Sequence, residues 1–153
     1  MIFKTALLLS ALVSTSAFAD SLMPGFVHWG APISAVQTAL TGKCSSLTVH
    51  RVQPPDLAGT QLEAQIDCEG FMFQQKPRHA EFVMGNGQLA MVRITTGADE
   101  DTALRTAMTA DYGAPNHSDD VYDDFASGDA AIRHDTHQVL FYAADAAPDF
   151  GKK

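Results

Sequence analysis

Polar and apolar residues alternate along two neighbouring stretches of the chain, and this pattern predicts strands. Residues 46–52 alternate over their whole length, and a proline pair at 54–55 follows them in a loop. Within Gln61–Phe73, every second residue between positions 62 and 69 is apolar, and the residues between them are acids and glutamines. An alternation of period two is typical of a strand that buries one side. We therefore expect an antiparallel strand whose polar side, which begins at Glu63, faces water.

The centre of the expected sheet is a hairpin over residues 79–95 that turns at Asn86-Gly87. This dipeptide is the strongest local signal for a type I′ turn, in which both central residues need a positive φ. The turn sets the register of three cross-strand pairs: Met84 with Leu89, Phe82 with Met91, and Ala80 with Arg93. Alternation along both strands then predicts two apolar faces. One face carries Phe82, Met84, Leu89 and Met91, and the other carries Val83, Ala90, Val92 and Ile94.

Two helices are expected, one before and one after these strands. In the first, Ser34 and Gln37 have the spacing of a capping box, and Gly42 supplies the stop. The second begins with three acids at residues 99–101, which favour the positive end of a helix dipole. Its apolar residues recur at the helical period, and Gly113 ends it.

The pattern of residues in the last third of the chain predicts fewer regular elements. A loop or a short strand is expected around 121–125, followed by a hairpin of residues 130–133 with 138–143. The element order is therefore α-β-β-β-β-α-β-β. We expect an α+β fold, in which an antiparallel sheet of about six strands carries both helices on one face. This element order resembles small exported α+β interaction domains of the β-lactamase-inhibitor and outer-membrane-assembly lipoprotein type.

Two similar tetrads do not indicate an internal repeat. Trp-Gly-Ala-Pro at residues 29–32 precedes the first expected helix, whereas Tyr-Gly-Ala-Pro at residues 112–115 follows the second. The two tetrads therefore occupy different places in the expected order of elements.

The N-terminus has the organisation of a secretory signal peptide. Lys4 supplies the positive charge, residues 6–13 form the apolar segment, and Ala-Phe-Ala at residues 17–19 forms the cleavage site. The apolar run is shorter than the roughly 20 residues that a transmembrane helix needs. We expect an exported chain, periplasmic or secreted, with no membrane insertion after cleavage. The expected segments are a signal peptide over residues 1–19, a single α+β domain over residues 20–145 and a flexible C-terminal tail over residues 146–153.

The two cysteines, Cys44 and Cys68, both lie in the exported part. An even pair in an oxidising compartment predicts one disulfide. Neither cysteine has a base or a cluster of ligands beside it in the sequence, and no Cys-x-x-Cys motif occurs. We therefore expect the bond to tie the end of the first helix to the strand within Gln61–Phe73.

The net charge of −8 at pH 7 is concentrated in the second half of the chain. From Asp99 onward there are twelve acidic and four basic residues. So acidic a chain disfavours nucleic acid and anionic membrane surfaces as partners. The expected partner is a protein or a small-molecule ligand in the periplasm or outside the cell.

The histidines and aspartates of the C-terminal part are the candidates for chemistry. His134 and His137 are three residues apart, but they fall at a predicted hairpin turn, where this spacing does not place them on one helix face. His117, Asp119 and Asp120 add possible ligands for a cation, yet the regular spacing of an EF-hand loop is absent. We expect a solvated acidic segment that holds no metal, and no cofactor; the alternative is a cation site made of these five residues.

A binding surface is the other candidate site. If the helices cover one apolar face of the sheet, the opposite face marks a site for a partner. The uncovered face carries either Val83, Ala90, Val92 and Ile94 or the set that contains Phe82, and we take the first set as the candidate surface. Its expected basic rim consists of Lys76, Arg78, His79, Arg51 and Arg93. The alternative is that a loop or the C-terminal strands bury this apolar strip.

Three functions remain open at this point. The favoured one is a small, soluble, exported, non-catalytic binding or inhibitory module. A metal-dependent or acid-base hydrolase that uses the His/Asp-rich C-terminal segment is the second, and an accessory factor of a cell-envelope complex is the third. The sequence has no Gly-x-Ser-x-Gly elbow and no glycine-rich phosphate loop, so we assign no catalytic residue.

Overall fold

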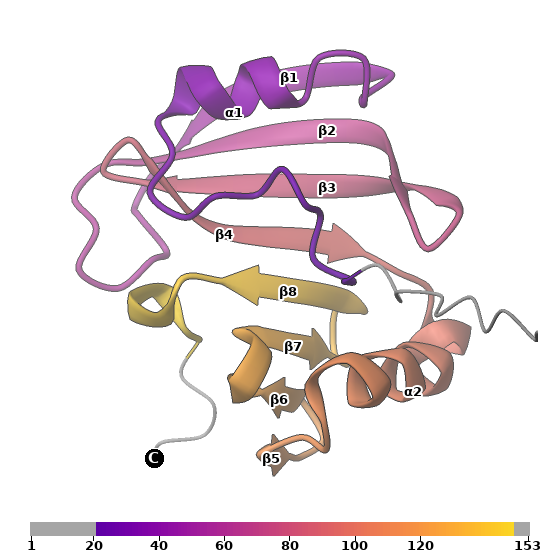
Figure 1. The fold of residues 1–153 in the computed structure, drawn as a ribbon. Coiled ribbons are helices and arrows are strands. Elements are labelled where there is room, and N and C mark those ends of the chain that lie inside the picture. Colours follow the sequence, from indigo (N-terminus) through magenta and orange to yellow (C-terminus); the bar gives the residue numbers. More distant parts are fainter. Residues whose placement is uncertain (1–20, 149–153) are drawn as a thin grey trace, which may run out of the picture.

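The computed structural model describes residues 21–148, which form one antiparallel sheet and two α-helices (Figure 1). The elements follow along the chain as α1 (Ile33–Ala39), β1 (Ser46–Val52), β2 (Glu63–Phe73), β3 (Lys76–Gly85), β4 (Gln88–Thr95), α2 (Asp101–Tyr112), β5 (His117–Ser118), β6 (Tyr122–Phe125), β7 (Ala130–Arg133) and β8 (Gln138–Tyr142). The order across the sheet is β1-β2-β3-β4-β8-β7-β6-β5. This arrangement confirms the α+β class and the antiparallel sheet.

The sheet has eight strands, whereas about six were expected, so the predicted element order was wrong in its last part. Four strands follow α2 instead of two. β5 has only two residues, and β6 contains two consecutive acids, Asp123 and Asp124. Neither segment shows the apolar alternation by which strands are recognised in a sequence.

The same set of elements occurs in each half of the fold. α1 is followed by β1–β4, and α2 is followed by β5–β8. Each set of four strands runs from an edge of the sheet to its middle, where β4 and β8 pair over five residues. The two Gly-Ala-Pro tetrads do not mark this repeat, since one precedes α1 and the other begins at the last residue of α2.

Both helices pack on the same face of the sheet, as expected (Figure 1). Val36 of α1 belongs to the same buried cluster as Leu104 and Met108 of α2. Val27, from the segment that precedes α1, joins this cluster as well. One core therefore underlies both halves of the chain.

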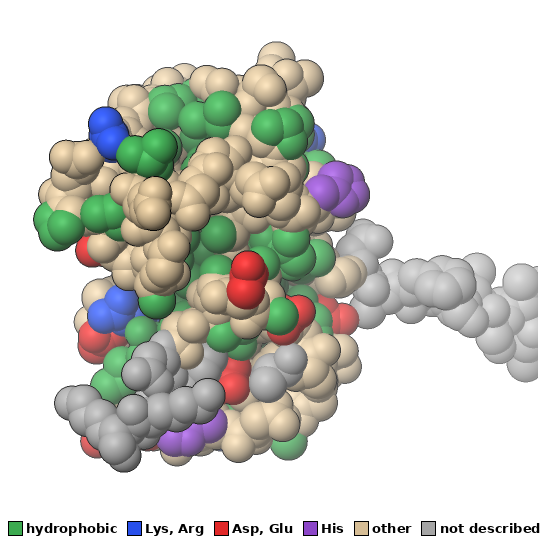
Figure 2. All heavy atoms as spheres, turned by 90° about the vertical axis from the view of Figure 1, so that its left-hand side faces the viewer, with side chains coloured by type: hydrophobic (Ala, Val, Ile, Leu, Met, Phe, Trp, Pro, Cys, Tyr) green, Lys and Arg blue, Asp and Glu red, His purple; other side chains and the backbone are tan. Residues whose placement is uncertain are grey.

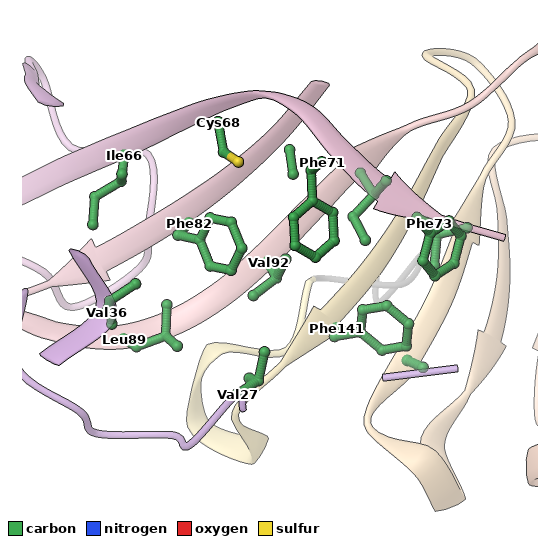
Figure 3. Packing of buried hydrophobic residues seen from close by; sticks show 14 of the residues in the cluster. Val27, Val36, Ile66, Cys68, Phe71, Phe73, Phe82, Leu89, Val92 and Phe141 are labelled. Carbon is green, nitrogen blue, oxygen red and sulfur yellow. The ribbon is translucent and has the colours of Figure 1, made fainter. Parts of the chain in front are cut away.

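Aromatic rings form the middle of this core (Figure 3). Phe71 and Phe82 meet edge to face with their centroids 5.8 Å apart. Phe73 of β2 meets Phe141 of β8 in a similar way at 6.3 Å, so residues of the two halves touch directly. Edge-to-face pairs of this kind add about 0.5–1.5 kcal/mol to what burial of the rings provides.

The central hairpin turns where expected, but its register differs from the prediction. Asn86 and Gly87 both have positive φ, 50° and 83°. The pairing shifts between Val83 and Met84, because Ala90 is an extra residue in β4, and Phe82 therefore pairs with Val92 instead of Met91. Such a bulge moves every later residue of its strand to the opposite face.

The ends of the helices agree only in part with the prediction. The expected capping box at Ser34 is wrong, because Pro32 is the N-cap residue and no side chain caps α1. Gly42 and Gly113 have positive φ, 75° and 86°, and follow the two helices as expected. A glycine at this position adopts the left-handed conformation without steric cost.

The predicted disulfide between Cys44 and Cys68 is confirmed, with 5.2 Å between the two Cα atoms. It ties the segment after α1 to the middle of β2. Within residues 21–148, neither helix has the length and apolar character needed to cross a membrane. The expected signal peptide lies outside the described residues, as do residues 149–153 of the expected tail.

Candidate binding face

The face of the sheet opposite the helices is called the open face below. Its side chains come from alternate residues of the strands. They include His50 of β1; Glu63, Gln65, Asp67 and Glu69 of β2; His79, Glu81 and Val83 of β3; Met91 and Arg93 of β4; Tyr122 and Asp124 of β6; Ala131 and Arg133 of β7; and Leu140 and Tyr142 of β8. No helix of the described chain covers these residues (Figure 1).

The middle of the open face holds a second, smaller buried cluster. Val83, Met91 and Leu140 belong to it, together with Ala131 and Tyr142. These residues are buried because the loop between β1 and β2 packs on them through Leu57, and because Tyr122 packs beside them. The polar groups of the open face surround this cluster.

A pocket of about 270 Å³ opens beside this cluster. Its lining includes Arg93, Arg133, Tyr122, Glu63 and Pro148. The guanidinium of Arg133 lies 5.7 Å from the centroid of the Tyr122 ring. Arginine and tyrosine are enriched at protein interfaces, so the lining is of the kind found in a binding pocket.

Glu63 is the most deeply buried acid of this pocket. Its side chain was expected to face water, but the residue is only 2% exposed, so that expectation was wrong. The Oε2 atom accepts the backbone N–H groups of Asp56 and Leu57 at 2.7 and 2.8 Å. The Oε1 atom is buried and has no hydrogen-bond partner among the described residues. Glu63 therefore holds the covering loop in place and lines the pocket.

A chain of polar contacts runs from this pocket toward the β1 edge. Arg93 lies between Glu81 and Gln65: its Nε atom is 2.8 Å from Oε2 of Glu81, and its Nη2 donates to Oε1 of Gln65 at 2.8 Å. Gln65 in turn donates through Nε2 to Oδ1 of Asp67 at 2.6 Å. Nδ1 of His50 lies 3.2 Å from Oδ2 of Asp67.

His79 stands in the middle of three acids. Its Nδ1 atom is 2.6 Å from Oε1 of Glu69, and its Nε2 atom is 3.4 Å from Oε1 of Glu81 and 4.0 Å from Oδ1 of Asp67. Burial lowers the pKa of His79, but the hydrogen bonds and the negative charges of Glu69 and Glu81 outweigh it and raise the pKa above the ordinary value of 6.5. The acids therefore stabilise a positive charge at this place.

The apolar strip predicted from the sequence does not lie on one exposed face. Val92 and Ile94 are fully buried under the helices, because the bulge at Ala90 turns them to that side. Val83 is on the open face but only 1% exposed, and Ala90 is half-buried. The binding surface proposed below therefore leaves out Val92 and Ile94.

The predicted basic rim is also divided between the two faces. His79 lies on the open face, but Arg78 and Lys76 pair with Glu100, at the start of α2, and Nη1 of Arg78 is 2.5 Å from Oε2 of that glutamate. The hydrogen bonds from Arg78, Lys76 and the Gly97 N–H lower the pKa of Glu100 to about 2. These two basic residues thus anchor the second helix and do not line the open face.

The structure brings together part of the C-terminal His/Asp set. Nδ1 of His134 lies 3.1 Å from Oδ2 of Asp101, and its Nε2 lies 3.3 Å from Oδ2 of Asp123. His137 approaches the same oxygen of Asp101 at 3.7 Å. Both ring nitrogens of His134 thus face carboxylates, and the contacts connect α2 and β6 to the turn between β7 and β8.

The remaining members of that set lie apart. His117 pairs with Asp119 at 2.8 Å in an exposed turn. The hydrogen bonds from His117 and from the backbone N–H groups of Tyr122 and Val121 lower the pKa of Asp119 to about 2. Asp120 is exposed. The five candidate residues therefore do not converge on one point.

A further hollow of about 460 Å³ lies at the end of the sheet that carries the β3–β4 turn. Figure 2 looks onto this end and shows hydrophobic, acidic and basic side chains mixed over the surface. Asp145 is the one ionisable residue in the lining. This hollow has fewer groups that can recognise a ligand than the open face has.

Comparisons with known proteins identify no relative. No protein-family model, no curated protein and no solved structure matches the chain. The open face is therefore interpreted from its own residues.

Several residues of the open face were not singled out from the sequence. Asp67 and Glu81 belong to different strands, and His50 belongs to a third. The alternation over residues 61–73 placed Asp67 on a polar side, but only the strand pairing shows which side chains of the neighbouring strands stand opposite it. These residues could have been found from the sequence only by predicting which residues of β2 and β3 pair with each other.

Proposed function

We propose that this chain is an exported, non-catalytic binding module that receives a protein partner on its open face. The observation that carries the proposal is the pocket in the middle of that face, which Tyr122, Arg133 and Glu63 line. A partner that inserts a side chain into this pocket would contact the arginine and the tyrosine, which are residue types that contribute strongly at interfaces.

The surroundings of the pocket support a macromolecular partner. The charged groups of Arg93, Glu81 and Asp67 extend from the pocket across three strands. An apolar centre with a polar border is the usual organisation of a protein interface, and complementary charges in the border give specificity. A small molecule would use the pocket but not this extended row of charges.

Export is supported by the disulfide and by the organisation of the N-terminal sequence. A bond between Cys44 and Cys68 persists in an oxidising compartment such as the periplasm or the outside of the cell. We therefore expect the partner in the same compartment.

Site-specific photocrosslinking in living cells that export the protein tests the proposal. A benzoylphenylalanine at Tyr122 on the open face should yield an adduct of one discrete mass, and the same probe at the exposed Gln37 of α1 should not. The reversal Arg133→Glu should lower the yield about tenfold or more, because an arginine in an interface centre contributes about 2 kcal/mol. The matched reversal Arg51→Glu, on the exposed opposite side of β1, should leave the yield unchanged.

Equal adducts from Tyr122 and Gln37, or a yield that responds to Arg51→Glu and not to Arg133→Glu, would contradict the proposal. A partner that also co-purifies in fixed stoichiometry without crosslinking would make the module an accessory factor of a stable complex.

A further inference from the structure

We infer that the open face carries a site for a first-row divalent transition metal ion, with Zn²⁺ as the expected occupant. The ligands are Nε2 of His79, Oε1 of Glu81 and Oδ1 of Asp67, and His50 lies beside them. The site goes beyond the proposed binding of a protein and stands independently of it.

The three ligand atoms are close enough for one ion. They lie within 4.8 Å of one another, and Nε2 of His79 is 3.4 Å from Oε1 of Glu81 and 4.0 Å from Oδ1 of Asp67. In a tetrahedral zinc site with bonds of 2.0–2.1 Å, the ligand atoms stand about 3.4 Å apart. Small side-chain movements of Asp67 therefore complete the arrangement. Within the described part of the chain, this is the one group of three such residues.

The strand register places like charges against each other at this point. Asp67 pairs directly with Glu81 across β2 and β3. Like charges directly opposite each other in a sheet are destabilising. Glu69 adds a third carboxylate. Of the three basic groups that face these acids, Arg93 contacts Glu81, His50 contacts Asp67, and His79 contacts all three. A divalent cation between Asp67 and Glu81 would remove this repulsion.

Two of the three ligands, His79 and Glu81, are also held from behind, as ligands of metal sites are, and the third, Oδ1 of Asp67, accepts a hydrogen bond from Gln65. The Nδ1 atom of His79 is hydrogen-bonded to Glu69, which directs the other ring nitrogen, Nε2, at Glu81 and Asp67. Arg93 contacts Oε2 of Glu81 and leaves Oε1 for the ion. A histidine whose second nitrogen contacts a carboxylate is the common pattern of a metal ligand.

The ligand types decide the class of the ion. An imidazole with two carboxylates is a mixed nitrogen and oxygen set, which suits Zn²⁺, Cu²⁺ or Ni²⁺. Ca²⁺ takes six to eight oxygen ligands, which these residues do not supply. His50, 3.2 Å from the other oxygen of Asp67, is placed to add a second imidazole.

Calorimetric titration with Zn²⁺ tests the site on the exported chain, purified without a histidine tag and freed of metal by a chelator. One Zn²⁺ should bind per chain, and Ca²⁺ should not. Glu69→Gln removes a partner of a ligand and should weaken Zn²⁺ binding about 10- to 100-fold. His79→Ala and Glu81→Gln remove ligands themselves and should weaken it more. Circular dichroism of each variant shows whether the fold is kept.

His117→Ala is the matched control, because His117 forms a similar pair with Asp119 but is not part of a group of three such ligands within residues 21–148. It should leave the affinity unchanged. With Cu²⁺ as the probe, electron paramagnetic resonance should show coupling to nitrogen, and this coupling should be reduced in a folded His79→Ala or, if that variant does not fold, in Glu81→Gln. Equal Zn²⁺ affinity in the wild type, His79→Ala and Glu81→Gln, or no stoichiometric binding by the wild type, overturns the inference. Either result leaves the Tyr122 crosslink unaffected.

Discussion

At the scale of single residues, Glu63 shows how one side chain links the fold to the site. Its Oε2 oxygen satisfies two backbone N–H groups of the loop that covers the middle of the open face. A carboxylate that accepts two backbone N–H groups is a strong acceptor, since hydrogen bonds to charged groups contribute about 1.5–3 kcal/mol. The covering loop is therefore held by an acid buried in the face that it covers.

Glu63→Ala should accordingly lower the free energy of unfolding by about 2–3 kcal/mol, because it leaves both N–H groups of Asp56 and Leu57 without their acceptor. Glu63→Gln keeps one acceptor oxygen and should cost clearly less. Urea unfolding of the three proteins measures the difference. If the alanine variant is as stable as the wild type, Glu63 does not hold the loop.

Glu100 gives a prediction that depends on pH. Its pKa is lowered to about 2 from an ordinary value of 4.5 by Arg78, Lys76 and the Gly97 N–H. A group whose pKa is lower in the folded state stabilises the fold above its unfolded pKa, and this contribution is lost as the pH falls through the folded pKa. The contribution of Glu100 should therefore be complete at pH 5 and above, decline between about pH 4.5 and 2, and vanish below.

The comparison of the wild type with Glu100→Gln isolates this effect. The glutamine variant should be less stable at pH 6, and the difference between the two proteins should shrink steadily from pH 4.5 to pH 2. Thermal unfolding at a series of pH values measures it. A difference that stays constant over this range would show that the Glu100 contacts do not depend on its charge.

At the scale of elements, the disulfide joins a short helix to the sheet. α1 has only seven residues, and helices of that length are not stable by themselves. The bond closes a segment with a sequence separation of 24 between Cys44 and Cys68. In the chain-entropy account, closing a loop of this size stabilises the folded state by about 3 kcal/mol.

The double variant Cys44→Ser/Cys68→Ser should therefore unfold at a lower urea concentration, with a loss of about 3 kcal/mol. Wild-type protein in a reducing agent is the control and should show a similar loss. If neither differs from the oxidised wild type, α1 and β2 are held together by packing alone.

The central hairpin shows how much of an element can be predicted from its sequence. The turn at Asn86-Gly87 follows from local chemistry, because few other residues accept positive φ at both positions. The extra residue Ala90 carries no such signal, since a small apolar residue fits a regular strand equally well. One unmarked residue thus reversed the predicted faces of Val92 and Ile94.

The candidate site depended on the same kind of information. The wet side of β2 was visible as alternation in the sequence, but the depth of Glu63 was not, because the loop that precedes this strand folds back over it. The spacing of His134 and His137 made them candidate ligands, but in the folded chain both side chains approach the carboxylate of Asp101. Local spacing predicts faces and turns, and it does not show which strands pair or what covers them.

At the scale of the whole molecule, the two sets of helix and four strands share one sheet and one core. The seam between them is the ladder of β4 with β8, five residue pairs long. Buried residues of the first half, such as Phe82, belong to the same cluster as Phe125 and Phe141 of the second. Neither half can separate without exposing apolar surface of both, and each Å² exposed costs roughly 25 cal/mol.

The whole chain should therefore unfold in a single transition. The chain has one tryptophan, Trp29, which packs against the core of the first half, and its three tyrosines, Tyr112, Tyr122 and Tyr142, all belong to the second half. Tryptophan fluorescence and the tyrosine signal in near-ultraviolet circular dichroism thus report on different halves. The two curves should coincide in urea, which is the test of two-state unfolding. Curves with separate midpoints would mean that the β4–β8 seam opens first and that each half holds its own core. The contact between Phe73 and Phe141 would then contribute little to the stability of either half.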